Sequence, residues 1–112
     1  MGLNPQLLRE IDLLHAEVCA ALADPKRIAL LYAMREGETT VSELAAALDL
    51  PQATVSRHLK VLRERGMVIP RREGMNVFYS VSNKKILRAL DLLREVLSEH
   101  LAGRGALAEA IH

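Results

Sequence analysis

The stretch DLPQATVSRHLKVLRERG (residues 49–66) predicts an amphipathic helix with an unusual polar face. Val55, Leu59 and Leu62 recur at spacings of three and four residues, so they share one face of a helix. When that face is buried, the opposite face carries Ala53, Arg57, Lys60 and Glu64, flanked by Thr54 and Ser56. A helix that only faced water would not need this mixture of small, amide, hydroxyl and basic side chains.

The polar face has the chemistry of base recognition. Small side chains allow close approach to a surface, and the guanidinium of Arg57 can donate two hydrogen bonds to a guanine edge. Gln52 lies in the first turn and can pair with an adenine, whereas His58 lies at the edge between the buried and polar faces, where packing is its expected role. A solvated helix face is the alternative. Together with the hairpin described next, the predicted DNA-contacting residues are Gln52, Ala53, Thr54, Ser56, Arg57, His58, Lys60, Arg71, Arg72 and Asn76.

The segment after Gly66 changes from a helical to an alternating pattern. MVIPRREGMNVFYSV (residues 67–81) predicts two short strands around a turn at residues 73–76. Pro70 places the first strand at an edge, and Arg71 and Arg72 are able to meet phosphate or a minor groove. This hairpin favours the DNA-binding interpretation of the preceding helix.

Two more helices are predicted before the quoted stretch. Asp24 can cap a helix that starts at Pro25 and ends at Gly37, and that buries Ile28, Leu31 and Tyr32 or Met34. Thr40 and Glu43 form a capping box for the next helix, which buries Val41, Leu44 and Leu48. The helix-turn-helix is expected at about 41–65 and the wing, meaning the hairpin, at about 67–81.

Helices at both ends of the chain have broad apolar faces. They are expected at about 5–22 and 83–102, the second one broken by Gly103 and Gly105, with a tail at 106–112 that frays or adds a turn. One small monomer cannot easily cover both faces, so we expect a homodimer formed through these helices. The expected fold is a single domain, 1–112, mainly α with a β-hairpin, of the winged helix-turn-helix class.

Composition limits the other functional classes. The 112 residues carry a net charge of +1, but the segment from Pro51 to Arg72 holds Arg57, Lys60, Arg63, Arg65, Arg71 and Arg72 against the single acid Glu64. Such a patch attracts a polyanion. No apolar run reaches the ~20 residues of a membrane span, no signal peptide is expected, and one cysteine suits a reducing compartment, so a cytoplasmic protein without membrane contact is predicted. No nucleophile motif or phosphate loop indicates an enzyme.

Residues 22–81 resemble the ArsR/SmtB family of bacterial winged-helix repressors. The matching pieces are LADPKR, SELAAALDLPQATVSRHLKVLRERGMV and RREGMNVFYS. The resemblance implies a homodimeric repressor that binds a palindromic operator in double-stranded DNA and leaves it when an inducer, often a metal or metalloid ion, binds. Pro51 stands where the family commonly has Ser, which removes a hydroxyl that could cap the helix or touch phosphate.

The resemblance also implies where a metal would bind, and this sequence departs from both sites. The thiolate site of the family corresponds to Thr40, Ser42 and Ala45, which offer no soft ligand. The site between the two last helices corresponds to Asn83, Lys85, Val96 and Glu99, which leave one plausible ligand. Both sites are therefore expected to be lost.

His15 and Cys19 form the remaining metal hypothesis. They are spaced i and i+4 on one helix, and His100 could join them across a dimer to hold zinc or another soft transition metal ion. A buried structural role for Cys19 competes with this hypothesis, as does oxidation of the thiol. No cofactor is required by the sequence.

The predicted function is therefore an inducible DNA-binding transcriptional repressor. The alternatives are a winged-helix regulator without a metal inducer and a protein–protein adaptor.

Overall fold

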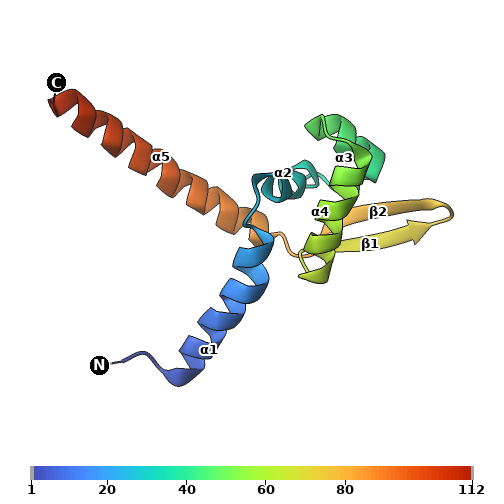
Figure 1. Cartoon of the computed structure of the whole chain (residues 1–112), viewed down its shortest axis with the longest axis horizontal. Coiled ribbons are helices and arrows are strands. Elements are labelled where there is room, and N and C mark those ends of the chain that lie inside the picture. The colour runs from blue at the N-terminus through green and yellow to red at the C-terminus, as the bar shows by residue number, and fades with distance from the viewer. Residues whose placement is uncertain (1, 112) are drawn as a thin grey trace.

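A computed structural model describes the backbone of residues 2–111 and the side chains of residues 2–105. The helices are α1 (Pro5–Leu13), which continues into the π-helical turn η1 (Leu14–Cys19), then α2 (Pro25–Ala33), α3 (Val41–Leu48), α4 (Gln52–Glu64) and α5 (Lys85–Ile111). The strands β1 (Val68–Glu73) and β2 (Asn76–Val81) form an antiparallel hairpin between α4 and α5. In Figure 1, α2, α3, α4 and the hairpin form one body, from which α1 and α5 project in different directions. The predicted mainly helical fold with one hairpin is confirmed.

The starts of the helices follow the predicted caps. Asp24 Oδ1 accepts the Lys26 N–H at 2.8 Å, and this backbone hydrogen bond lowers the pKa of Asp24. Thr40 Oγ1 accepts the Glu43 N–H at 3.2 Å, but the return half of the predicted capping box is different, because the Glu43 carboxylate accepts from the Thr39 hydroxyl at 2.8 Å. α4 begins after Pro51 without a side-chain cap, as the missing hydroxyl predicted.

The core is built around the apolar stripe of α4. Val55, Leu59 and Leu62 are at most 1% exposed and pack in one cluster with α2 and α3, whose fully buried members are Leu30, Leu31 and Leu44. Met67 and Val68 extend the cluster to the base of the hairpin. The predicted face of α4 is thus the buried one, which leaves its polar face outside.

Backbone hydrogen bonds hold the hairpin against the helical body. The strands are joined by the two-residue loop Gly74–Met75, in which Gly74 has φ +61°, a conformation that glycine adopts without a steric penalty. The Thr39 N–H donates to the Tyr79 carbonyl at 3.0 Å, and the Tyr79 N–H donates to the Thr39 carbonyl at 2.8 Å. Thr39, in the segment just before α3, therefore forms an isolated antiparallel β-bridge with β2.

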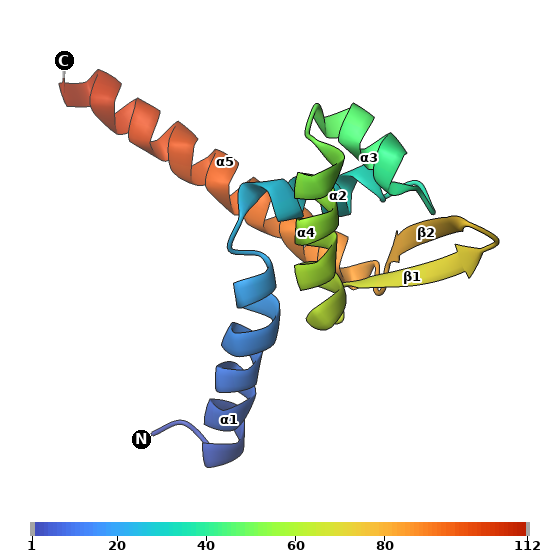
Figure 2. The ribbon, with the colours of Figure 1, turned by 45° about the vertical axis from the view of Figure 1, so that its right-hand side comes forward.

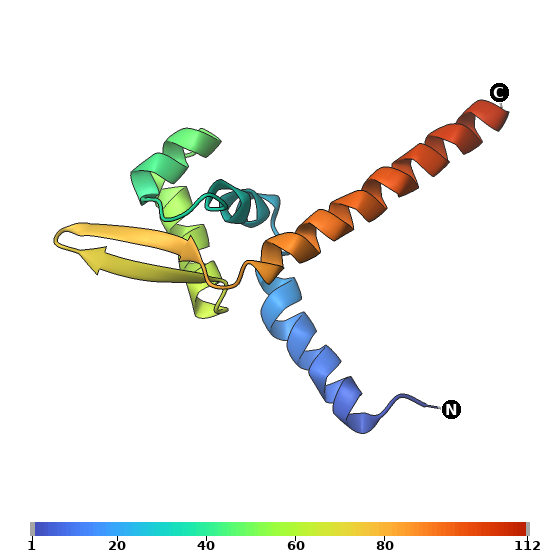
Figure 3. The same cartoon turned by 180° about the vertical axis from the view of Figure 1, so that it is seen from behind.

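The two end helices touch the body over short lengths only (Figures 2 and 3). α5 is anchored by buried Leu87 and Leu90, and the half-buried Tyr32 hydroxyl of α2 donates to Asp91 at 2.7 Å. Burial and this carboxylate raise the pKa of Tyr32. The described side chains on α5 beyond Asp91 and those of residues 2–17 are exposed, many of them leucines. None of the described helices is long and apolar enough to cross a membrane.

Two helix boundaries and one predicted burial are corrected. Gly103 and Gly105 do not break α5, since isolated glycines cost a helix only ~1 kcal/mol each and their neighbours are good helix formers. α2 ends at Ala33 rather than Gly37, because a turn intervenes before Gly37, where φ is +138°. The first helix covers its predicted range but widens into the π-helical turn η1, where the Ala20 N–H bonds to the His15 carbonyl. Ile28 is half-buried rather than buried. The side chains of the predicted tail, 106–112, lie outside the described residues.

We predict that Leu59→Ala will lower the free energy of unfolding by about 2–5 kcal/mol, because it leaves a cavity at the centre of the core. Urea unfolding at one fixed protein concentration measures this loss. Lys60→Ala, on the exposed face of the same turn, is the matched control and should change stability by less than about 0.5 kcal/mol. Equal losses of unfolding free energy in the two variants would contradict the orientation of α4, in which Leu59 is buried and Lys60 is exposed.

Candidate nucleic-acid interface

The exposed face of α4 carries most of the predicted DNA-contacting side chains. Its exposed members are Gln52, Ala53, Ser56, Arg57 and Lys60, while Thr54 is half-buried. Gln52 Nε2 donates to Ser42 Oγ of α3 at 3.4 Å. This long bond leaves the amide oxygen and the other N–H of Gln52 for a further partner. The structure therefore gathers the predicted reading residues on one surface of a single helix.

His58 is turned away from this surface. Its half-buried ring places Nδ1 3.4 Å from Nη1 of Arg27. The same guanidinium donates through Nε to the Ala21 carbonyl at 2.7 Å and through Nη2 to the Ala20 carbonyl at 3.2 Å. Because a guanidinium is only a donor, we assign Nδ1 of His58 as the acceptor. The side chain thus links α4 to the end of the first helix, which matches its predicted packing role rather than a base contact.

Arg71 on the hairpin is occupied by two carboxylates. Its Nε lies 2.7 Å from Glu38 Oε2 and its Nη1 lies 2.9 Å from Glu73 Oε2, while the guanidinium stacks 5.0 Å from the ring centre of Phe78. The hydrogen bond to Glu38, followed by that to Glu73, raises the pKa of Arg71, and the same bond lowers the pKa of Glu38. Arg71 therefore ties the hairpin to the loop before α3, and a phosphate would have to displace these carboxylates to reach it.

Arg72 and Asn76 lie elsewhere on the hairpin. Arg72 pairs across the strands with Val77, so its side chain lies on the opposite face from Arg71. Asn76 is exposed beside the loop, directly opposite Glu73. The same phosphate or minor-groove contact was predicted for both adjacent arginines, but their surroundings in the structure differ.

Arg63 is a candidate contact that the predicted set omitted. It is exposed on the last full turn of α4, three residues after Lys60. It lines a hollow between α4 and the hairpin together with Pro70, Arg72, Val77 and Tyr79. The helical spacing from Lys60 could have indicated it, but its nearness to the wing could not be known from the sequence.

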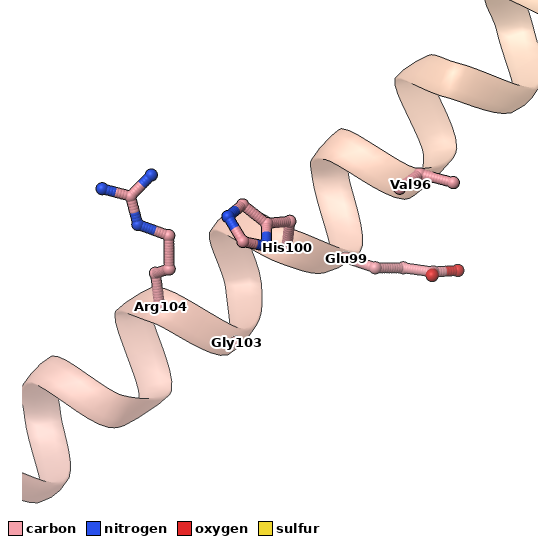
Figure 4. Close-up of a pocket in the computed structure, with 5 residues that line it drawn as sticks. All are labelled: Val96, Glu99, His100, Gly103 and Arg104. Carbon is pink, nitrogen blue, oxygen red and sulfur yellow. The ribbon is translucent and has the colours of Figure 1, made fainter.

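One chain does not assemble the predicted metal site. His15 and Cys19 are both exposed on η1, whereas His100 lies on α5, which runs in a different direction (Figure 3). Figure 4 shows His100 on a face of α5 that lines one pocket with Val96, Glu99, Gly103 and Arg104. Among the described residues, no three His, Cys, Asp or Glu side chains are grouped to hold a metal ion. The buried role considered for Cys19 is not seen in the single chain either.

The elements around α4 define the class of protein. α3 and α4 are joined by a short turn in which Asp49 has φ +52°, and the two-stranded hairpin follows α4 directly. Two helices joined by a tight turn, the second exposing a polar and basic face beside a hairpin, are the arrangement of a winged helix-turn-helix protein.

Comparison with known proteins identifies the family. Residues 24–69 match the family model described as bacterial regulatory protein, arsR family. The chain is 41% identical over 86 residues to the transcriptional repressor SmtB homolog of a Synechocystis species, covering 77% of this chain and 62% of the relative. It is 38% identical over 88 residues to the transcriptional regulator NmtR of Mycobacterium tuberculosis, covering 77% of this chain and 71% of the relative. The chain belongs to the arsR family of bacterial regulatory proteins.

A solved structure supports the same fold. The homodimeric winged helix-turn-helix DNA-binding domain of a possible ArsR-family regulator from Mycobacterium bovis superposes with a TM-score of 0.74 at 31% identity. The match covers 89% of this chain and 92% of that domain. The chain nevertheless spans only 62%, 62% and 56% of the length of three curated repressors that it matches. The resemblance stated from the sequence is confirmed.

We predict that Arg71→Gln will raise the pKa of Glu38 towards its ordinary value of 4.5. The folded-state pKa is lowered, so the favourable Arg71–Glu38 interaction is present above pH ~4.5 and is lost as pH falls through the folded-state value. NMR titration of the side-chain carboxyl carbon measures the change. Arg72→Gln is the matched control, and an equal shift in that variant would contradict the pairing.

Proposed function

We propose that the chain is a transcriptional repressor that binds double-stranded DNA sequence-specifically as a homodimer. α4 enters the major groove with Arg57 and Lys60 towards the bases or phosphates, and the hairpin lies beside the adjacent backbone. The observation that carries this proposal is the exposed polar and basic face of α4 next to the wing, in a chain of the arsR family. The relatives are named as repressors and regulators, so no enzymatic activity is included.

A second copy of the chain is the proposed cover for the end helices. Leu7, Leu8, Ile11 and Leu14 are between 41% and 52% exposed, and Leu93, Val96, Leu97 and Leu101 are between 52% and 61% exposed. Contiguous apolar faces of this kind indicate an interface. The domain from Mycobacterium bovis, which is described as homodimeric, supports this arrangement. A two-fold dimer presents two α4 helices to two half-sites about one turn of DNA apart, which requires a palindromic operator.

A protein–protein adaptor is the alternative function. An adaptor has no need for the basic residues of α4, which make DNA binding the better-supported function. Arg57, Lys60 and Arg63 have no carboxylate within 4.0 Å among the residues that the structure describes. Arg65, by contrast, pairs with Glu17 at 3.5 Å, so it is a weaker candidate for DNA contact.

The proposed DNA binding does not depend on a particular inducer. The residues of one chain do not fit a metal centre, and His15, Cys19 and His100 could meet only between two copies. Titration of zinc into the DNA complex tests this possibility directly. Release of DNA by the natural chain but not by Cys19→Ser would assign zinc to these residues, whereas unchanged binding in both would support a regulator without a metal inducer. Peroxide treatment of the same two proteins tests thiol oxidation in the same assay.

We predict that Arg57→Ala will weaken binding to DNA from upstream of the chain's own gene by about 1–3 kcal/mol, roughly 5–150-fold, because it removes a bidentate base contact. Fluorescence anisotropy at moderate salt measures the affinity. Arg88→Ala removes the same charge from exposed α5 and is the matched control. Unchanged affinity for Arg57→Ala, with a folded dimer, would refute the reading role of α4.

We predict that Leu97→Glu will raise the dimer dissociation constant by about 100-fold or more, since it places a charge in the apolar face of α5 that a second copy is proposed to cover. Sedimentation at micromolar concentration measures the change. Ser98→Glu adds the same charge at the next position of the helix and should leave the dimer intact. A natural chain that sediments as a folded monomer would contradict the proposed dimer.

A further inference from the structure

The hairpin presents its two adjacent arginines to two different environments. Side chains alternate along a strand, so Arg71 shares a face with its cross-strand partner Phe78, and Arg72 shares the other face with Val77. The Arg71 guanidinium is held by Glu38 and Glu73. These three residues together carry a formal charge of −1, so this face of the hairpin attracts an anion poorly.

The other face of the hairpin forms a basic hollow with α4. Arg63 of α4 and Arg72 of β1 line it, and Pro70, Val77 and Tyr79 complete its wall. Its volume is about 210 Å³, which is room for a tetrahedral anion and several waters at about 30 Å³ each. No acidic side chain lines the hollow, and within the described part of the chain neither arginine has a carboxylate within 4.0 Å.

The hollow lies where a DNA strand would pass. A helix in the major groove and a wing at the neighbouring minor groove lie on either side of the sugar-phosphate strand that separates these grooves. Figure 2 shows α4 and the hairpin at an angle to each other, and the hollow of Arg63 and Arg72 lies between these two elements. Arg63 also continues the exposed series of Arg57 and Lys60 along α4 towards this angle.

We propose that Arg63 and Arg72 together grip one backbone phosphate of the bound DNA in the hollow between α4 and the hairpin. This inference rests on the proposed DNA-binding function and adds the phosphate site to it. Guanidinium groups match the geometry of phosphate oxygens, and two of them from different elements fix the register of helix and wing on the strand. Arg71 has a different role, because it holds the hairpin in place for this contact.

Salt dependence of DNA binding tests the proposal. The logarithm of affinity falls with the logarithm of salt concentration with a slope of about −0.9 for each phosphate neutralised. Anisotropy titrations at several salt concentrations, on a duplex of about 30 base pairs that holds two half-sites, give this slope for the natural chain, Arg63→Gln, Arg72→Gln and the double variant. Arg88→Gln is the control for loss of one positive charge away from the hollow. Equal thermal midpoints confirm that these exposed substitutions leave the fold intact.

The change in the salt-dependence slope of the double variant tells whether the two arginines share one phosphate. A slope flattened by about 1.8 for the dimer, which is about 0.9 for each half-site, with each single variant intermediate and Arg88→Gln unchanged, supports one shared phosphate per chain. Flattening by about 3.6 for the dimer indicates two separate phosphates in each half-site and overturns the shared site, and no flattening excludes contact altogether. If the natural chain binds DNA normally, either of these results removes only the phosphate site. If the natural chain shows no salt-dependent DNA binding, the proposed function itself falls and the phosphate site falls with it.

Discussion

The burial of Val55, Leu59 and Leu62 fixes the rotation of α4, and the candidate interface depends on that rotation. A helix turns by about 100° per residue, so the choice of buried positions determines every exposed position. With these three side chains inside, Arg57, Lys60 and Arg63 stand outside together. The helix needs no side-chain cap to achieve this, since Pro51 starts it in a favourable backbone conformation and the core supplies the stability.

The position of the wing depends on residues far away in the sequence. The backbone pair between Thr39 and Tyr79 and the ion pair between Glu38 and Arg71 both join the hairpin to the short segment before α3. That segment is itself capped onto α3 through the Thr39–Glu43 hydrogen bond. The wing and the helix-turn-helix are therefore held together by this segment. An exposed ion pair contributes little energy by itself, but two parallel backbone hydrogen bonds beside it restrict the direction of the hairpin.

The sequence predicted the parts of this molecule that have strong local signals. The local sequence signals correctly predicted the apolar stripe of α4, the caps at Asp24 and Thr40, and the hairpin. Each of these features depends on a few neighbouring residues. Of the candidate site, the exposed face of α4 was predicted well. Three features of the site could not be predicted from the sequence. They are the different surroundings of Arg71 and Arg72, the link of His58 to Arg27, and the place of Arg63 beside the wing. Each depends on tertiary packing between segments that composition and periodicity do not connect. The length of α5 was misjudged because two glycines have too small an effect to end a helix with good neighbours.

Two part-buried polar links and the exposed pair of Glu17 with Arg65 connect the end helices to the DNA-binding body. Arg27 bonds the last carbonyl oxygens of the first helix and also contacts His58 on α4, while Tyr32 bonds Asp91 at the point where α5 leaves the body. Arg94 stacks over the Tyr32 ring at 5.3 Å and also lies 3.4 Å from Asp91, which strengthens the second link. Beyond these links the end helices touch little of their own chain, so a partner that covers their apolar faces also sets their direction.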